Sequence, residues 1–228
     1  MRIDPRTENT ARPAPPALPT AVRTPLAVAA VCGAVALVVL GVLFAGQTSG
    51  TAFDAWIRSP LMELHAPWRQ IALVVDYTAE PVGGALVLGT LTLVFLRLGH
   101  RRAALLTVLG TGTSIAITTG LKPVVGRDIN NGFFAFPSGH TATATAFALV
   151  AMLVLVQRRR LRATPATALV AAVTLTAAVV MAFAQVLLNA HYPTDTIGGF
   201  ATAVAVVPAV GHAIDRVADR AQGRETTK

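Results

Sequence analysis

Two short polar segments carry most of the side chains in this sequence that could do chemistry. The first, Phe136-Pro137-Ser138-Gly139-His140-Thr141, precedes an apolar run, so we expect a helix to begin here with Ser138 as its N-cap. Backbone N–H groups in the first turn of a helix bind anions, and Gly139 lets an anion approach the backbone closely. His140 can protonate a leaving group. The segment therefore predicts an anion site with a proton donor, although a plain capped helix with a histidine at the membrane surface fits it too.

The second segment is His191-Tyr192-Pro193-Thr194-Asp195. Pro193 is expected to end the preceding helix at or before Tyr192. A carboxylate near an imidazole can keep one ring nitrogen protonated and leave the other free to attack. We therefore expect His191 to be a nucleophile and Asp195 to orient it. The alternative is a polar turn that merely connects two helices.

Two cations precede the first segment. Lys122 could hold phosphate oxygens as a point charge, and Arg127 could do so with two parallel hydrogen bonds. For Lys122 alone, extension toward lipid headgroups is the alternative. Together with the histidines, the carboxylate and the helix start, these cations predict a phosphoryl-transfer site. The sequence shows no carboxylate cluster, and Cys32 is its one cysteine, so no metal site and no cofactor are predicted.

The elements that must position these residues are membrane helices. Of the 228 residues, 54% are apolar and 13% are charged, about half the charged share of a soluble domain. The chain is therefore neither an ordinary soluble domain nor disordered. Since a spanning helix needs about 20 residues, we predict an all-α polytopic protein with six transmembrane helices. The apolar runs are 26–46, 82–98, 103–121, 141–156, 166–188 and 197–214.

The predicted domain boundaries follow from these runs. Residues 1–25 contain six prolines and are expected to form a disordered cytoplasmic tail. Residues 26–214 form the membrane domain, and residues 215–228 form a second cytoplasmic tail. The spans are almost free of ionisable groups, which argues against a coupled transporter of lipid phosphates.

The basic residues predict the orientation. With six spans, fifteen Lys and Arg residues lie on the side that holds both termini and the loops around 97–102 and 158–162. Four lie on the other side, and cytoplasmic loops carry the excess of positive charge. Both termini are thus predicted to be cytoplasmic in the plasma membrane. The net charge of +8 needs no nucleic-acid partner, because anionic lipid headgroups account for it.

The same topology places both polar segments on one face. The chain crosses the membrane twice between His140 and His191, so both are predicted to emerge on the extracytoplasmic side. A single composite site outside the membrane is therefore expected.

With these residues, the chain resembles the type 2 phosphatidic acid phosphatase superfamily of membrane lipid phosphatases, to which the vanadium haloperoxidases are related. The family motifs are K-x6-R-P, P-S-G-H and S-R-x5-H-x3-D. The second is complete at residues 137–140, and the third is present as His191 and Asp195, followed by Thr196-Ile197-Gly198-Gly199. The resemblance covers about residues 26–214.

Two positions depart from the family pattern. Ile129-Asn130 stands where the family has arginine and proline, and Ala184-Gln185 stands where it has serine and arginine. Arg127 is expected to compensate for the first arginine. Gln185 keeps hydrogen-bond donors but has no charge, so weaker phosphate binding is expected.

The resemblance implies a metal-independent phosphatase that acts on a lipid phosphate or diphosphate: polyprenyl diphosphate, phosphatidic acid or phosphatidylglycerol phosphate. It implies that His191 forms a phosphohistidine, that Asp195 orients it, and that His140 protonates the leaving oxygen and then activates water. The residues expected to hold the phosphate are Lys122, Arg127, Ser138, Gly139 and Gln185. The alternative is a non-catalytic family member that binds lipid phosphates or partner proteins. The sequence makes no prediction of oligomeric state.

Overall fold

The computed structural model describes residues 14–130 and 132–225 and is almost wholly helical. This confirms the predicted all-α class, with one short hairpin added. In chain order the elements are η1 (Thr20–Val22), α1 (Arg23–Leu43), α2 (Ala52–Met62), α3 (Trp68–Tyr77), α4 (Pro81–Arg97), α5 (Arg101–Val125), β1 (Asp128–Ile129), β2 (Phe133–Phe134), α6 (Gly139–Arg159), α7 (Ala163–Leu187) and α8 (Pro193–Glu225).

The long helices confirm a polytopic membrane protein. Among the described residues, five helical segments are long and apolar enough to span a membrane, and they correspond to α1, α5, α6, α7 and most of α8. The remaining predicted span, 82–98, falls on α4, which has 17 residues and qualifies only together with α3, to which it is joined by a bend of 60°. A Cβ atom at Gly83 would lie 1.8 Å from the Tyr77 carbonyl oxygen, so this bend requires glycine there.

The bundle packs around α8, which contacts α1, α5 and α6, while α6 also packs against α7. Small residues permit the closest approach. A Cβ atom at Gly33 on α1 would lie 2.8 Å from the Ala201 carbonyl oxygen of α8, so the two backbones nearly touch. Leu106, Val150 and Val207 are fully buried in the resulting core.

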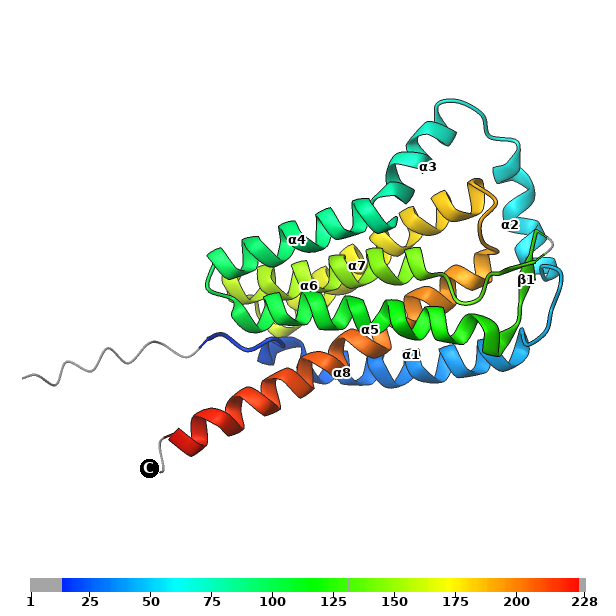
Figure 1. Cartoon of the computed structure of the whole chain (residues 1–228). Helices are drawn as coiled ribbons and strands as arrows, with labels where there is room; N and C mark the ends of the chain where they lie inside the picture. Colours follow the sequence, from blue (N-terminus) through cyan, green and yellow to red (C-terminus); the bar gives the residue numbers. More distant parts are fainter. Residues whose placement is uncertain (1–13, 131, 226–228) are drawn as a thin grey trace, which may run out of the picture.

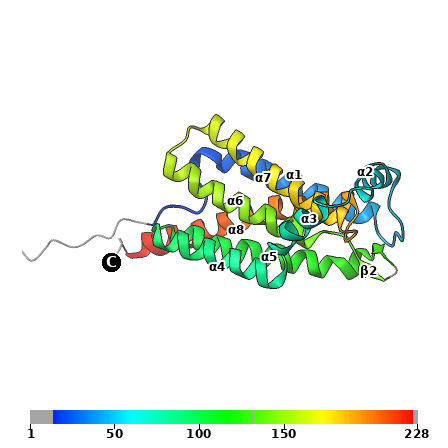
Figure 2. The ribbon, with the colours of Figure 1, turned by 90° about the horizontal axis from the view of Figure 1, so that it is seen from above.

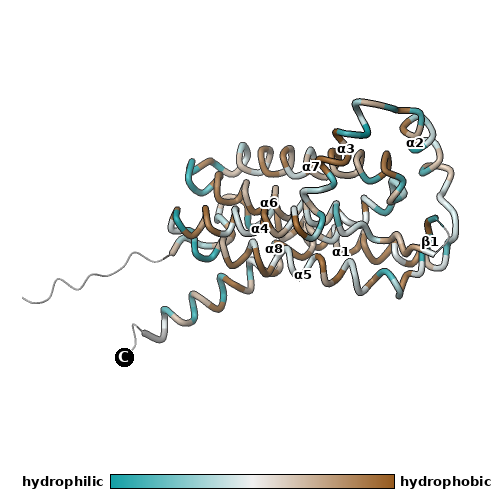
Figure 3. Tube along the Cα trace, turned by 45° about the horizontal axis from the view of Figure 1, so that its top comes forward, coloured by the Kyte–Doolittle hydropathy of each residue, from teal (hydrophilic) through white to brown (hydrophobic). Residues whose placement is uncertain are grey.

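Polar and apolar residues separate along the bundle. Figures 1 and 2 show α2, α3 and the β1–β2 hairpin at one end, called here the hairpin end, whereas the described chain starts and finishes toward the other end. Figure 3 shows hydrophobic residues along the helices and hydrophilic ones mainly at the two ends. This is the distribution expected of membrane helices. Which end faces the cytoplasm remains a prediction.

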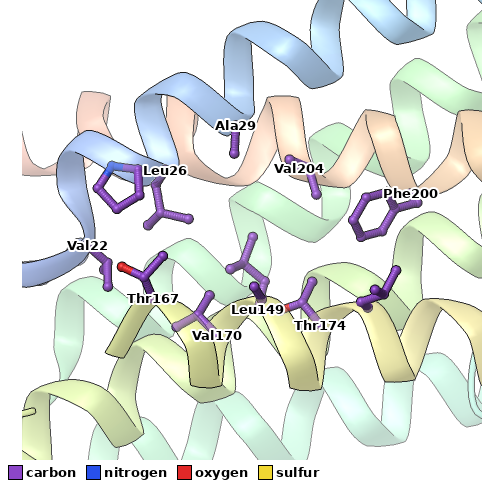
Figure 4. Close-up of a pocket in the computed structure, with 12 residues that line it drawn as sticks. Val22, Leu26, Ala29, Leu149, Thr167, Val170, Thr174, Phe200 and Val204 are labelled. Atoms are coloured by element: carbon purple, nitrogen blue, oxygen red, sulfur yellow. The ribbon is translucent and has the colours of Figure 1, made fainter. Parts of the chain in front are cut away.

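An apolar cavity lies between η1, α1, α6, α7 and α8 (Figure 4). Its volume is about 320 Å³, and its lining includes Leu26, Val170 and Phe200. No charged side chain lines it, and none of the residues predicted to do chemistry does. The cavity therefore does not hold the phosphate group.

The N-terminal segment differs from the prediction. Residues 1–25 were expected to be disordered, but within 14–25 the side chains of Ala17, Leu18 and Val22 are buried. The backbone N–H groups of Ala17 and Leu18 donate to the Asp215 carboxylate at 2.7 and 3.0 Å. The predicted disorder is therefore wrong for residues 14–25, because a buried carboxylate on α8 satisfies their backbone. Residues 1–13 lie outside the described residues.

The helix that carries the last predicted span extends beyond the predicted end of the membrane domain. The membrane domain was expected to end at residue 214, but α8 continues unbroken to Glu225. Asp215 and Asp219 on this extension accept hydrogen bonds from Arg102 at 3.2 and 2.7 Å. These pairs join the extension to α5.

Candidate active site

The two polar segments of the sequence meet directly at the hairpin end. The Ser138 backbone N–H donates to the Asp195 carbonyl oxygen at 3.0 Å. A Cβ atom at Gly199 would lie 2.3 Å from the Ser138 carbonyl oxygen, so only glycine lets α8 approach this closely. The two segments, which topology predicts to share one site, are therefore in contact.

The start of α6 is built as the sequence predicts. Ser138 is the N-cap, and its buried hydroxyl accepts a hydrogen bond from the Thr141 backbone N–H at 3.3 Å. Gly139 and His140 are the first two helical residues. The N–H groups at such positions have no partner within the helix and carry its positive dipole end. This end of α6 is therefore suited to bind an anion.

His191 and Asp195 form a buried pair after α7. His191 Nδ1 lies 3.7 Å from Asp195 Oδ2, and their side chains are 6% and 0% exposed. That separation exceeds a hydrogen bond, but catalytic hydrogen bonds often shorten when substrate binds. Since Nδ1 faces the carboxylate, Nε2 is the nitrogen available for attack.

The surroundings keep His191 neutral. Burial lowers the pKa of His191, and the nearby charges of Lys122 and His140 lower it further, against the opposite influence of Asp195. An imidazole that resists protonation keeps the lone pair that a nucleophile needs.

Arg127 lies in a setting different from the predicted phosphate contact. Its side chain is completely buried, and its terminal nitrogens donate to Asp195 Oδ1 at 2.5 Å and to Asp54 Oδ2 at 2.7 Å. The rings of Phe44 and Tyr192 lie over the guanidinium, with centroids 4.1 and 4.6 Å away. Both ends of the guanidinium fork are therefore bound to carboxylates, and Arg127 braces Asp195.

Asp54 on α2 is a residue that sequence reasoning missed. It is fully buried, and its carboxylate accepts hydrogen bonds from Arg127, from the Thr194 backbone and hydroxyl, and from Thr51. Burial acts to raise the pKa of Asp54, but these hydrogen bonds outweigh it and lower the pKa overall. Thr51 and Asp54 form a capping box, and that spacing is visible in the sequence. Its pairing with Arg127 is not.

His140 faces two carboxylates that the sequence analysis also missed. Its Nε2 lies 3.5 Å from Asp76 Oδ1 and 3.6 Å from Glu80 Oε1. Asp76 is on α3, and Glu80 is the N-cap of α4, so the 60° bend between these helices brings both to the start of α6. The His140 side chain is 28% exposed, far more than that of His191.

The two departures from the family pattern have structural partners. Ile129 is buried against Ala135 and Tyr192, so it is part of a small hydrophobic cluster beneath the hairpin. The buried Gln185 side chain donates a hydrogen bond to Asp76. Gln185 was predicted to contact phosphate, but this amide nitrogen is directed at a carboxylate.

Lys122 completes the cluster. It lies in the last turn of α5, close enough for its charge to act on Asp195 and His191. The structure therefore gathers every residue predicted for the site at the hairpin end. It places Arg127 and Gln185 in supporting contacts with carboxylates.

One group of side chains here could hold a metal ion. The ligand atoms of Asp76, Glu80 and His140 all lie within 4.8 Å of one another. The sequence predicted no metal site, because Asp76 and Glu80 lie far from His140 along the chain.

Known proteins resemble this chain in sequence pattern and in fold. The family model PAP2 superfamily matches residues 113–218, which include Lys122, His140 and His191. A crystal structure described as the first transmembrane PAP2 type phosphatidylglycerolphosphate phosphatase, from Bacillus subtilis, superimposes with a TM-score of 0.65. The match covers 82% of this chain and 96% of that one at 19% identity, which shows a shared fold. No curated protein matches the sequence.

Proposed function

Because the chain belongs to the PAP2 superfamily, we propose that it is a lipid phosphatase that works through a phosphohistidine on His191, without a metal ion, at the extracytoplasmic membrane face. The observation that carries this proposal is the buried His191–Asp195 pair beside the start of α6. It combines an oriented, neutral nucleophile with an anion-binding helix end.

In the first step, His191 Nε2 attacks phosphorus and forms a P–N bond. The bond from phosphorus to the lipid oxygen breaks, and that oxygen takes a proton from the His140 imidazolium. Asp195 holds His191 Nδ1–H throughout, so the ring keeps the tautomer that exposes Nε2. The products are a free lipid hydroxyl, or a lipid monophosphate from a diphosphate, and phosphohistidine.

In the second step, a water molecule attacks the phosphohistidine. His140, now neutral, takes a proton from that water as its oxygen bonds to phosphorus. The P–N bond breaks, and its electron pair returns to His191. Inorganic phosphate leaves, and both histidines are back in their starting states.

Lys122, the Ser138 hydroxyl and the first-turn N–H groups at Gly139 and His140 hold the phosphate oxygens in this proposal. Arg127 does not bind the phosphate in this proposal; it holds Asp195 in place. The phosphate is thus held with few charged groups, since Ile129 is buried in the core and Gln185 bonds Asp76. Hydrogen bonds to charged donors are roughly twice as strong as neutral ones, so modest phosphate affinity is expected.

The substrate class follows from the position of the site. A phosphate group in the headgroup region reaches the hairpin end, while its chains stay among the apolar helices. Polyprenyl diphosphate, phosphatidic acid and phosphatidylglycerol phosphate all meet this requirement. The Bacillus subtilis protein of similar fold is described as acting on the last of these.

The test is phosphate release from these three lipids by the purified protein in a metal chelator, together with trapping of an acid-labile, alkali-stable phosphoenzyme. We expect release from at least one lipid and loss of both signals in His191→Ala. The matched control is His212→Ala, a change of the same type in α8 beyond the predicted site residues. Retention of full activity in His191→Ala, or a need for added Mg²⁺, contradicts the proposal.

A second candidate function is supported by the two departures. Ile129 and Gln185 replace both arginines of the family pattern, which favours a protein that binds lipid phosphates without hydrolysing them. In that case a direct binding measurement detects the lipid on the wild-type protein, but the assay above detects neither released phosphate nor phosphoenzyme.

A further inference from the structure

We propose that Asp76, held in place by Gln185, is a positioning residue for His140, so that the general acid has its own carboxylate partner. This inference rests on the proposed function, in which His140 donates and then takes up a proton. It assigns a role to Asp76 and gives Gln185 a purpose other than phosphate binding.

The first support is the geometry around His140. Nε2 is the ring nitrogen that the protein encloses, and it has no hydrogen-bond partner closer than the two carboxylates. Asp76 is the better shielded of the two, with its side chain 17% exposed against 47% for Glu80. Because water weakens the interaction of exposed charges, Asp76 is the dominant partner.

The second support is the way Asp76 is fixed. It lies near the end of α3, and the Gln185 side chain reaches it from α7 with a hydrogen bond to Oδ1, the same oxygen that faces His140. Gln185 is 1% exposed, so its amide has little freedom to turn elsewhere. The backbone carbonyl of Gln185 also accepts hydrogen bonds from the N–H groups of Ala190 and His191, at 2.9 and 3.4 Å. One residue therefore links the partner of His140 to the loop that carries the nucleophile.

The consequence is control of the His140 tautomer. When Nε2–H is directed at Asp76, Nδ1 is the nitrogen left for the leaving oxygen. In the first step the proton passes from Nδ1 of the imidazolium to that oxygen as the P–O bond breaks. The ring that remains is protonated at Nε2 and free at Nδ1, ready to accept the proton of the attacking water.

A leaving-group test separates this role from a structural one. The leaving group of a lipid phosphate is an alkoxide, which needs a proton as the P–O bond breaks. The leaving group of p-nitrophenyl phosphate is a stable phenolate, which needs none. In a single turnover, Asp76→Asn should lower the rate of phosphoenzyme formation from the lipid phosphate by about ten- to a hundredfold, a part of what general acid catalysis contributes. KM for the lipid should stay within about twofold, and so should the rate of phosphoenzyme formation from p-nitrophenyl phosphate, because the water attack that both substrates share is not part of that rate.

Three further variants sharpen the test. Glu80→Gln is the matched control and should show a smaller loss, because that carboxylate is about half exposed. Gln185→Leu should show the same leaving-group pattern as Asp76→Asn but weaker, and it serves as the test if Asp76→Asn fails to fold. His140→Ala should show the strongest discrimination between the two substrates.

The outcomes are distinct. Equal losses on both substrates in Asp76→Asn mean that Asp76 only supports the fold, and they overturn the inference. Activity of the wild-type protein that is lost in a chelator and restored by Mg²⁺ or Mn²⁺ means that Asp76, Glu80 and His140 hold a metal ion, and this also overturns it. If the wild-type protein forms no phosphoenzyme, or His140→Ala shows no discrimination, the proposed function itself fails.

Discussion

The two histidines of the site sit in contrasting surroundings. The His191–Asp195 pair is almost completely buried, with side chains 6% and 0% exposed, whereas His140 and Asp76 are 28% and 17% exposed. A buried arginine braces the first carboxylate, and a neutral glutamine holds the second. The nucleophile is thus enclosed among buried ionic contacts, and the proton donor sits in a more open setting beside two carboxylates.

The difference corresponds to what each histidine has to do. A nucleophile must keep one tautomer and one direction of attack, which rigid, buried neighbours ensure. A general acid that becomes a general base must reach a leaving oxygen and then a water molecule, which requires access.

The brace around Asp195 also joins distant parts of the chain, because Asp54 comes from α2 and Arg127 from the segment after α5.

The largest expected effect is on the buried pair. Asp195→Asn should reduce the rate of phosphoenzyme formation by about 10⁴-fold, because an amide no longer enforces the Nδ1–H tautomer, as when the triad aspartate of a serine protease is replaced. Rapid-quench measurement of phosphohistidine in a single turnover checks this. The same assay on Asp76→Asn should give a much smaller loss. Equal losses in the two variants would remove the contrast between the pairs.

The next effect is on stability. Arg127→Met leaves Asp54 and Asp195 buried without their cation, and breaking a buried ion pair in this way costs about 3–5 kcal/mol. The melting temperature in detergent should fall steeply, whereas Arg69→Met, at an exposed arginine, should leave it nearly unchanged. Adding Asp54→Asn to Arg127→Met should recover part of the loss, because one uncompensated charge is removed. A folded Arg127→Met protein with unchanged melting temperature contradicts the bracing role.

Much of the fold and part of the site could be predicted from local sequence. Apolar runs in the sequence predict the positions of α1, α4, α5, α6, α7 and α8. The N-cap at Ser138 is predicted because a serine stands directly before an apolar run. Counting membrane crossings predicts that Ser138 and Asp195 lie at the same end of the bundle, where the structure brings them into contact. These inferences need only the chain near each residue, together with topology.

The missed features all depend on contacts between distant segments. Asp54 lies 73 residues before its partner Arg127, and Asp76 lies 109 residues before Gln185. Nothing near Arg127 in the sequence shows that carboxylates, and not a phosphate, occupy both ends of its guanidinium. The predicted disorder of residues 14–25 was wrong for the same reason, since Asp215 on α8 binds that segment.

The contrast between the pairs also predicts a dependence of stability on pH. Burial lowers the pKa of His191 below its ordinary value of about 6.5. As the pH falls below that value, the unfolded chain takes up a proton at His191 while the folded chain does not, so stability decreases with falling pH by at most about 1.4 kcal/mol per unit. His191→Gln should flatten the decline of melting temperature between about pH 6.5 and 5. His65→Gln, in the exposed segment between α2 and α3, should keep the wild-type slope. An unchanged slope in His191→Gln means that His191 is not held neutral.

The smallest effect is expected from restoring the family's arginine at position 185. Gln185→Arg restores the arginine of the third motif, but position 185 lies beside Asp76, so the new guanidinium pairs with that carboxylate before it reaches a phosphate. Because the new guanidinium binds Asp76 and not the phosphate, kcat/KM for the lipid phosphate should change by less than about fivefold. In Asp76→Asn/Gln185→Arg the guanidinium is released toward the phosphate, so KM should fall while kcat stays low because His140 has lost its partner. A tenfold or greater rise in kcat/KM from Gln185→Arg alone would mean that Asp76 does not hold the side chain at 185, and that His140 works without the carboxylate partner described here.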